Sequence, residues 1–488
     1  MKKANNLVKM KKIVLVIPPQ EKFTKDYLPS LGLGYIASCL ERANYEVKII
    51  DSHINNFDDE QTINKVLEKK PDAVGITANS HNRFHAISVC KGIKRKSNNQ
   101  IFVSVGGCHF SPTAVSLLET IPEIDVVVIG EGERTFVDLL NNYFQNKSLD
   151  NVLGIVFRKN GKIIKTSYRP FIKNLDELPR PAWHLFELEK YDAKLEGEDE
   201  TKSIGIMSSR GCPNACSFCV NSIFWKRVFR RHSPRRFVDD VEFLHKKYGY
   251  RGFDFWDDTI TTVREHIKGI CEEILKRKLD IVWYARARVN TVDREILTLM
   301  KKAGCKVIGF GVESGNPEIL KNIKKNITVE QVRKIVKICV NLNYIIKLFF
   351  MYNLPGETLK DIRATRDLMR ELKFYGSNVH VIPAFSLIYP GTEMESMAKK
   401  EDCLAHDFNW NNPVKFTVSE KIGVNPTIPP YEQKQLKSED IKTFLESKTV
   451  QFVGLIKSIS PAIKGVKNFE DFQYLLKRGV NYLKQKVS

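Results

Sequence analysis

Short apolar runs alternate with amphipathic stretches along most of this 488-residue chain, in two separate series. In the first series, the predicted strands are 13–17, 47–50, 73–76, 101–105 and 126–129. The predicted helices between and after them are 31–43, 59–69, 82–97, 111–120 and 133–144. Strands and helices that alternate at this spacing form right-handed crossovers, and the strands then pair in parallel. Residues 1–150 are therefore expected to form a doubly wound parallel sheet.

A second series with the same alternation begins near residue 204. Its predicted strands are 204–208, 252–256, 281–285, 306–311, 345–351 and 378–382. Its predicted helices are 235–248, 262–277, 293–302, 328–342 and 358–373. Six such units make a partial version of the eight-unit barrel. We therefore expect an α/β protein with four parts: the doubly wound domain 1–150, a proline-punctuated linker 151–200, a partial (β/α)6 barrel 201–395, and a mainly helical C-terminal region 396–488.

Three cysteines directly follow the first strand of the second series. Cys212, Cys216 and Cys219 have the spacing C-x3-C-x2-C. Three thiolates this close can hold three irons of a cubane iron–sulfur cluster, whereas ferredoxin-type sites supply four cysteines per cluster. The fourth iron would then be free for another ligand. A zinc site is the alternative; it would require a fourth ligand nearby, and His232 is the nearest downstream candidate.

Composition restricts the cellular setting and the partners. The N-terminal apolar run 13–17 is too short for a signal peptide, and no apolar stretch reaches 18 residues. Ten cysteines in such a chain indicate metal binding and free thiols rather than disulfides, so a cytoplasmic location is expected. The net charge of +20 is spread widely, which is typical of a solvated surface. A phosphate-rich ligand or an anionic membrane surface is the alternative; without a recognisable module, no nucleic-acid partner is predicted.

Glycine is frequent at the strand ends of the first series, where doubly wound sheets bind ligands. The segments Leu31-Gly-Leu-Gly-Tyr35, Gly106-Gly-Cys-His109 and Gly130-Glu-Gly-Glu-Arg-Thr135 resemble those of the cobalamin-binding domain fused to many radical S-adenosylmethionine (SAM) enzymes. The resemblance implies that cobalamin contacts Leu31, Gly32, Thr77, Asn79, Gly106, Gly107, His109, Gly130, Glu131 and Gly132. Tight turns in an unliganded flavodoxin-like domain are the alternative. The loop 18–30 lacks the histidine that ligates cobalt in the methionine-synthase type, so the lower axial ligand is unassigned.

The cysteine loop and the strand ends after it resemble the radical SAM superfamily, in which the amino and carboxylate groups of SAM occupy the open iron. The matching segments are Phe255-Trp256-Asp257-Asp258, Gly311-Val-Glu313-Ser314-Gly315 and Asn353-Leu-Pro-Gly-Glu-Thr358, with Arg288 after the third strand. The resemblance implies a [4Fe-4S] cluster on the three cysteines. It also implies a SAM site formed by Trp256, Asp257, Asp258, Arg288, Glu313, Ser314, Pro355 and Gly356. A helix cap at Asp258 and an ordinary turn at Pro355-Gly356 are the alternatives.

Together, the two resemblances identify the chain as a member of the cobalamin-binding-domain-containing radical SAM enzymes. It is similar to class B radical SAM methyltransferases and to anaerobic magnesium-protoporphyrin ester cyclase-like proteins. The implied activity is reductive cleavage of SAM at the cluster, with methylation of an unactivated carbon of a small-molecule or lipid-like substrate. Two alternatives are open: a cobalamin radical SAM cyclase or oxidoreductase without methyl transfer, and a non-catalytic corrinoid- or cluster-binding sensor.

Two further segments bear on partners. A basic run follows the cysteine loop: Lys226, Arg227, Arg230, Arg231, Arg235 and Arg236. It is either a solvated face or a docking patch for an electron donor such as flavodoxin or ferredoxin. Within it, Ser233-Pro234 predicts a helix start. The stretch 468–488 repeats apolar residues on one helical face, which either packs on the protein, contacts a membrane surface or covers a lipid-like substrate.

Overall fold

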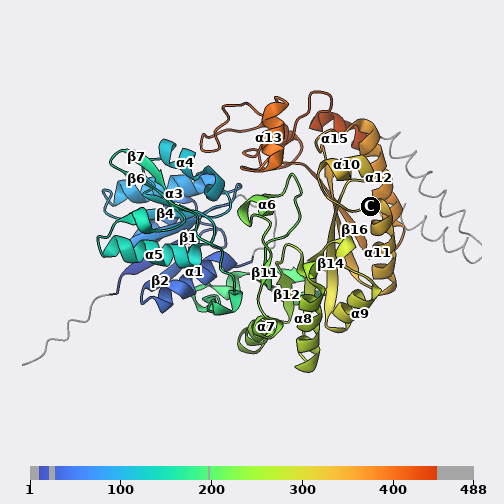
Figure 1. Ribbon diagram of the computed structural model, residues 1–488, viewed down its shortest axis with the longest axis horizontal. Coiled ribbons are helices and arrows are strands. Elements are labelled where there is room, and N and C mark those ends of the chain that lie inside the picture. The colour runs from blue at the N-terminus through green and yellow to red at the C-terminus, as the bar shows by residue number, and fades with distance from the viewer. Residues whose placement is uncertain (1–9, 21–27, 196–197, 448–488) are drawn as a thin grey trace, which may run out of the picture.

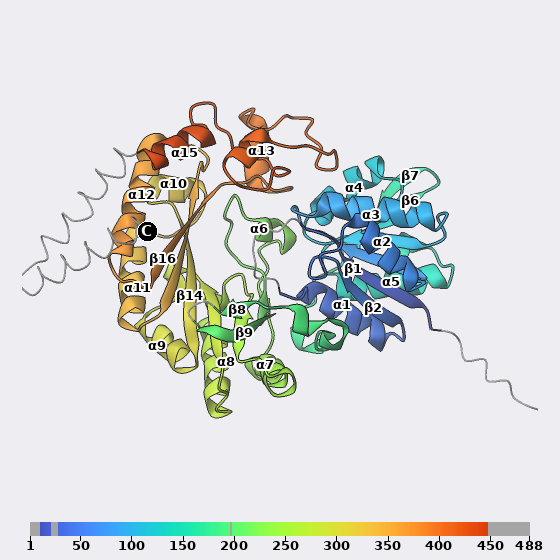
Figure 2. The same cartoon turned by 180° about the vertical axis from the view of Figure 1, so that it is seen from behind.

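The computed structural model describes residues 10–20, 28–195 and 198–447, and two seven-stranded sheets form its framework. Figure 1 shows the two sheets side by side, each with its own helices. Figures 1 and 2 also show the segment around α13 above the space between them. The predicted helix at 468–488 lies outside the described residues.

The N-terminal sheet has the order β2-β1-β3-β4-β5-β6-β7. Its first five strands are parallel: β1 (Lys12–Ile17), β2 (Glu46–Asp51), β3 (Ala73–Thr77), β4 (Phe102–Gly106) and β5 (Val126–Val128). Two antiparallel strands, β6 (Ile155–Lys159) and β7 (Lys162–Lys165), continue this sheet beyond residue 150. The sequence did not predict them, because they do not continue the strand–helix alternation and β7 has no buried residue.

Helices cover both faces of this sheet, as the alternation of strand and helix predicts. One apolar core lies under α1 (Leu31–Arg42) and α5 (Gly132–Phe144). The other lies under α2 (Asp59–Glu68), α3 (Arg83–Lys96) and α4 (Phe110–Thr120). Burial on both faces explains why the central strands read as continuous apolar runs rather than alternating ones. The predicted doubly wound architecture is confirmed.

The second sheet is a curled, open half-barrel with the order β16-β15-β14-β13-β12-β9-β8. Its strands are β8 (Lys194–Leu195), β9 (Glu198–Ile206), β12 (Gly252–Phe255), β13 (Val282–Ala287), β14 (Cys305–Glu313), β15 (Ile345–Tyr352) and β16 (Val379–Phe385). All are parallel except β8. Its helices are α7 (Pro234–Tyr248), α8 (Arg264–Lys276), α9 (Arg294–Lys302), α10 (Pro317–Asn322), α11 (Val329–Asn341) and α12 (Leu359–Lys373). The predicted six-unit partial barrel is confirmed.

The inner face of the half-barrel is less buried than its outer face. Along β15, buried residues such as Leu348 and Phe350 alternate with half-buried Phe349 and Met351. Side chains on a strand point alternately to opposite faces, so the more exposed set lies on the face that the outer helices do not cover. An open, partly apolar inner face leaves room for a ligand beside the strand ends.

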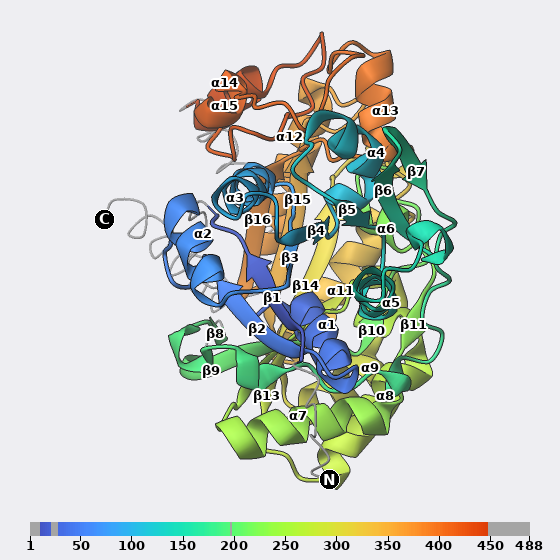
Figure 3. The same ribbon diagram turned by 90° about the vertical axis from the view of Figure 1, so that its left-hand side faces the viewer.

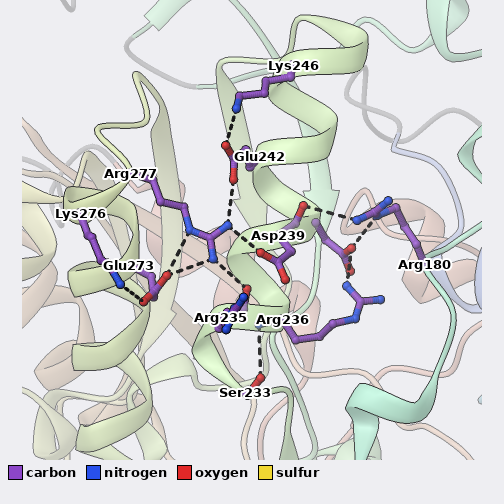
Figure 4. Close-up of polar contacts among 11 residues, drawn as sticks. Arg180, Ser233, Arg235, Arg236, Asp239, Glu242, Lys246, Glu273, Lys276 and Arg277 are labelled. Atoms are coloured by element: carbon purple, nitrogen blue, oxygen red, sulfur yellow. Dashed lines mark hydrogen bonds and ion pairs between the residues drawn. The ribbon is translucent and has the colours of Figure 1, made fainter.

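Helix α7 begins where the sequence predicts and anchors part of the basic run. The Ser233 hydroxyl accepts a hydrogen bond from the backbone N–H of Arg236, and Pro234 occupies the first turn. Figure 4 shows the ion pairs around this helix. Arg277 Nη1 lies 2.7 Å from Asp239 Oδ1 and connects α8 to α7. Arg236 pairs with Asp240 on its own helix, so this member of the run is already neutralised.

The C-terminal region contains α13 (Glu393–Lys400), α14 (Thr417–Lys421) and α15 (Ser438–Glu446). It is attached to the N-terminal domain through Arg83, which is fully buried. Arg83 Nη2 donates to Thr427 O at 2.6 Å, and its Nε donates to Trp410 O at 3.1 Å. Among the described residues, none of the helices is long and apolar enough to cross a membrane.

Candidate functional site

A cavity of about 200 Å³ lies at the carboxyl ends of β1, β3, β4 and β5, with α1 and α5 forming part of its wall. This is the edge at which doubly wound sheets bind ligands. Eight of the ten predicted cobalamin-binding residues line it: Leu31, Gly32, Thr77, Gly106, Gly107, Gly130, Glu131 and Gly132. The wall is mainly apolar, as a pocket for a flat aromatic base would be. The residues present therefore fit the aromatic end of a cobalamin.

Two glycines of this wall have different physical reasons to be glycine. A Cβ at Gly32 would meet no atom within 4 Å, so a side chain there would enter open space. Gly107 has a φ of +104°, and its Cβ would lie 2.5 Å from Ala78 O. Gly107 is required by the turn itself, whereas Gly32 lines the cavity at a point where a side chain would have room.

The other two predicted cobalamin residues, Asn79 and His109, do not line this cavity. The Asn79 carboxamide oxygen accepts a hydrogen bond from His81 N at 2.8 Å and shapes the loop after β3. His109 Nδ1 lies 2.9 Å from Ser80 Oγ. Burial, together with nearby Arg83, lowers the pKa of His109 well below its usual value, so the ring is neutral at pH 7. Contacts of these two residues with cobalamin remain predictions.

The three cysteines lie on a loop between two short strands. β10 (Ser209–Arg210) and β11 (Arg230–Arg231) pair antiparallel, and the loop between them contains α6 (Val220–Phe224). Cys219 N donates to Cys216 O at 3.1 Å, which turns the chain between these two cysteines. Cys216 Sγ lies 3.8 Å from Lys324 O and 3.8 Å from Arg288 Nη1. The guanidinium of Arg288 therefore places a positive charge beside one sulfur of the cysteine loop.

The chemistry of the donors favours a cluster over a single zinc ion. Within residues 10–20, 28–195 and 198–447, no three His, Cys, Asp or Glu side chains gather closely enough to hold one metal ion. A cubane does not need such a gathering, because each cysteine binds a different iron. His232, the candidate fourth zinc ligand, has Nδ1 3.1 Å from Asp176 Oδ1 and Nε2 3.4 Å from Tyr35 Oη. Both ring nitrogens of His232 are therefore engaged.

The acidic pair after β12 lies beside the cysteine loop, but its two members differ. Asp257 is buried and accepts hydrogen bonds from the hydroxyl of Ser208 at 2.7 Å and from that of Ser209. Its carboxylate therefore holds the chain that leads into the cysteine loop. Asp258 bonds to Asn221 in α6, and burial together with neighbouring Asp257 raises its pKa to about 6. The backbone N–H of Trp256, which precedes the pair, donates to Ile206 O at 2.8 Å.

Glu313 ends β14 in a buried ion pair. Its Oε1 lies 2.6 Å from Lys325 Nζ, and each side chain is 8% exposed. The backbone φ of Glu313 is +69°, a left-handed conformation that is uncommon for a residue other than glycine. Arg288 also contacts this segment, because it donates to Lys325 O. Sequence reasoning missed Lys325, since a lysine in a loop carries no signal that it will be buried.

The remaining predicted SAM residues make contacts within the protein. The Ser314 hydroxyl lies 3.1 Å from Thr365 Oγ1 and accepts from Asn316 N, just before α10. Gly356, which follows Pro355 in the turn after β15, donates its N–H to Gln433 Oε1 at 2.9 Å. The C-terminal region therefore supports this turn, which the sequence did not indicate. The roles of these residues toward SAM remain predictions.

Comparison with known proteins identifies both halves of the chain. Residues 206–369 match the Radical SAM superfamily, and residues 24–140 match the B12 binding domain. An uncharacterized methyltransferase of Pyrococcus horikoshii is 33% identical over 98% of this chain and 98% of that protein. Cytidylyl-2-hydroxyethylphosphonate methyltransferase of Streptomyces wedmorensis is 28% identical over 74% of this chain and 78% of that protein. The anaerobic magnesium-protoporphyrin IX monomethyl ester cyclase of Rubrivivax gelatinosus is 29% identical over 70% of this chain and 62% of that protein.

Solved structures share the fold across nearly the whole chain. The cobalamin-dependent SAM radical enzyme OxsB, solved with aqua-cobalamin and SAM bound, superposes with a TM-score of 0.71. The match covers 97% of this chain and 71% of that chain, at 18% sequence identity. The methyltransferase TsrM from Kitasatospora setae gives a TM-score of 0.66 over 80% of this chain and 78% of that chain, at 19% identity.

A B12-binding sheet joined to a half-barrel with three cysteines defines a class of iron–sulfur enzymes. The chain belongs to the cobalamin-binding radical SAM family, a family that includes methyltransferases. Its cofactors are a [4Fe-4S] cluster, SAM and cobalamin. The sequence-based prediction of the family is confirmed.

Proposed function

We propose that this enzyme cleaves SAM reductively at a [4Fe-4S] cluster held by Cys212, Cys216 and Cys219, and methylates an unactivated carbon. One observation carries this proposal: the segment that holds the cysteine loop also forms part of the cobalamin cavity. Met207, Arg210, Phe224 and Trp225 line that cavity together with the strand ends of the N-terminal domain. The two proposed cofactor sites therefore border on one space.

When bound, the cofactors supply the electron, the radical and the methyl group; the protein supplies binding and orientation. The three thiolates would hold three irons of the cluster, and the fourth iron would be free to bind SAM. Arg288 places a cation beside Cys216, and Asp258 lies near the loop with a carboxyl whose pKa is raised to about 6 by burial and by Asp257. The inner face of β15 is partly apolar and would suit a substrate with an apolar part. This agrees with the small-molecule or lipid-like substrate that we propose.

The names of relatives favour methyl transfer over the alternatives. Two of the relatives described above are called methyltransferases, and another in Methylococcus capsulatus is called hopanoid C-3 methylase. Because another relative is called a cyclase, a cyclase or oxidoreductase activity is the second candidate. The sensor alternative lacks support, because the family is one of enzymes.

An electron donor is part of the proposal, since SAM cleavage consumes an electron. We propose an acidic flavodoxin or ferredoxin at the exposed cations of the basic run: Lys226, Arg227, Arg231 and Arg235. Arg230 is buried and Arg236 is ion-paired, so these two are not available for docking. Membrane association through the C-terminal stretch remains an untested alternative that concerns residues outside the described part.

Methyl-deuterated SAM should separate the two candidate activities. We expect incubation with reductant and substrate extract to give a product that carries deuterium, because the transferred methyl group originates in SAM. Mass spectrometry of the product and of 5′-deoxyadenosine gives the readout. A product without label, formed together with 5′-deoxyadenosine, would favour the cyclase or oxidoreductase instead.

Replacing Gly32 by Phe should block cobalamin binding. The side chain would enter the open space of the cavity, so we expect the dissociation constant to rise at least about tenfold, a loss of roughly 1.4 kcal/mol. Gly32→Ala, which adds one methyl group, is the matched control and should bind nearly as the wild type does. Equal cobalamin affinity of Gly32→Phe and wild type, measured by absorbance titration, would place cobalamin elsewhere.

A further inference from the structure

Four buried charged side chains join the cobalamin domain to the base of the cysteine loop. Arg210 Nη1 lies 2.7 Å from Glu131 Oε1, and Arg210 Nη2 lies 2.6 Å from Glu133 Oε1. Arg230 Nη1 also lies 2.7 Å from Glu131 Oε1. All four side chains are 5–7% exposed. We call Glu131, Glu133, Arg210 and Arg230 the interdomain ion-pair cluster.

The four residues of the cluster belong to segments next to the two proposed cofactor sites. Both arginines lie on the paired strands β10 and β11, and Arg210 is two residues before Cys212. Glu131 directly precedes α5 and Glu133 lies in its first turn, and both line the cobalamin cavity. Figure 3 shows α5 in front of β10 and β11. One set of ion pairs therefore connects the cobalamin cavity to the strand that leads into the cysteine loop.

The half-barrel also holds the chain just before the cysteine loop. Asp257, at the end of β12, accepts hydrogen bonds from Ser208 and Ser209, which directly precede Arg210. Arg210 also lies over the ring of Tyr35, with its guanidinium carbon 5.1 Å from the ring centroid. Consecutive residues thus bond to the two halves of the molecule, the serines to the barrel and the arginine to the N-terminal domain.

Burying charged side chains costs free energy. In this cluster the cost is not fully offset by hydrogen bonds. Two of the donors of Arg230, Nε and Nη2, have no hydrogen-bond partner among the described residues. The guanidinium carbon of Arg230 lies 4.6 Å from the ring centroid of Phe171. This cation–π contact offsets only part of the free energy lost with the two missing hydrogen bonds. Buried ion pairs often contribute less to stability than apolar residues would, and their best-attested use is to specify one arrangement.

We propose that the interdomain ion-pair cluster positions the cysteine loop relative to the cobalamin cavity, so that the two cofactors keep one fixed separation. This proposal rests on the proposed function, because it needs both cofactors in those sites. The four side chains act through the loop and the turn that they join, and they are positioning residues rather than catalytic ones. It also gives Glu131 a role different from direct cobalamin contact.

Pulsed dipolar electron paramagnetic resonance on the reconstituted enzyme tests the proposal. Cob(II)alamin and the reduced cluster are both paramagnetic, so their dipolar coupling reports the distance between them. We expect one narrow distribution of distances between cob(II)alamin and the cluster in the wild type. In Arg210→Met we expect this narrow distribution to be lost. Glu133→Gln, which keeps the shape of the side chain and leaves the contact of Arg210 with Glu131, is the milder variant if Arg210→Met assembles poorly.

Arg134→Met is the matched control. Arg134 is adjacent to Glu133, and its ion pair with Glu177 is about half exposed, so the narrow distance should persist. A wild-type distance in both Arg210→Met and Glu133→Gln, with both cofactors bound, would overturn the proposal.

Hydrogen exchange of the cofactor-free proteins separates this proposal from the proposed function. We expect Arg210→Met to increase exchange in both 206–212 and 130–136, and Arg134→Met to leave 206–212 unchanged. Unchanged exchange in both segments of Arg210→Met would contradict the positioning role. If the wild type lacked either paramagnetic signal, the proposed function would fail, while this exchange result would still decide whether the cluster joins the two segments.

Discussion

Replacing Cys212, Cys216 and Cys219 together by alanine should reduce the iron content from about four per chain to near zero and abolish SAM cleavage. The reason is that each cysteine is expected to hold a separate iron, and the other seven cysteines are spread singly along the sequence. Iron and sulfide analysis after anaerobic reconstitution gives the first readout, and formation of 5′-deoxyadenosine under strong reductant gives the second.

The control for the cysteine variant is a pair of cysteines outside the loop. Cys108 is exposed and Cys403 is half buried, and neither lies near the loop in sequence. The double variant Cys108→Ala, Cys403→Ala should retain the full iron content and SAM cleavage. About four irons per chain in the triple variant would show that the cluster is held elsewhere.

Replacing Glu313 by Gln should destabilise the barrel domain by about 3–5 kcal/mol, because it leaves the ammonium of Lys325 buried without its carboxylate. The measurement is the melting temperature or denaturant midpoint of the cofactor-free protein. A contact of Glu313 with SAM predicts, in addition, a roughly 10- to 100-fold weaker SAM affinity in cluster-loaded protein. Iron content, stability and SAM affinity measured on the same variant separate the two effects.

The neighbouring lysine provides a matched control. Lys324 Nζ lies 2.6 Å from Glu393 Oε1, the same distance as in the buried pair, but both side chains are nearly half exposed. Glu393→Gln should therefore change stability by no more than about 1 kcal/mol. Equal effects of the two substitutions would show that burial of the Glu313–Lys325 pair does not matter.

The order and type of the main elements could be predicted from the sequence, because the periodicity of apolar residues is a local property. The helix start at Ser233-Pro234 is local in the same sense. Strands β6 and β7 escaped prediction, since both contain basic residues and no helical stretch separates them. The three candidate cysteine ligands could also be picked out from the sequence, because their spacing within one loop limits what they can bind.

The surroundings of the sites depended on contacts between distant segments. Glu131 and Arg210 are 79 residues apart in the chain, and their pairing follows from the way that the two sheets meet. Asp257 matches a family motif, but the structure shows its carboxylate bonded to Ser208 and Ser209. The burial of Lys325 likewise depends on where β14 ends.

The sequence by itself thus determined the class of fold, the family and the choice of candidate cluster ligands, because these depend on local pattern and spacing. Only the tertiary structure decided which charged residues are neutralised inside the protein and which line the cavity. The physical reason is that the desolvation and pairing of a charge depend on neighbours that the folded chain brings together, and these neighbours lie far away in the sequence.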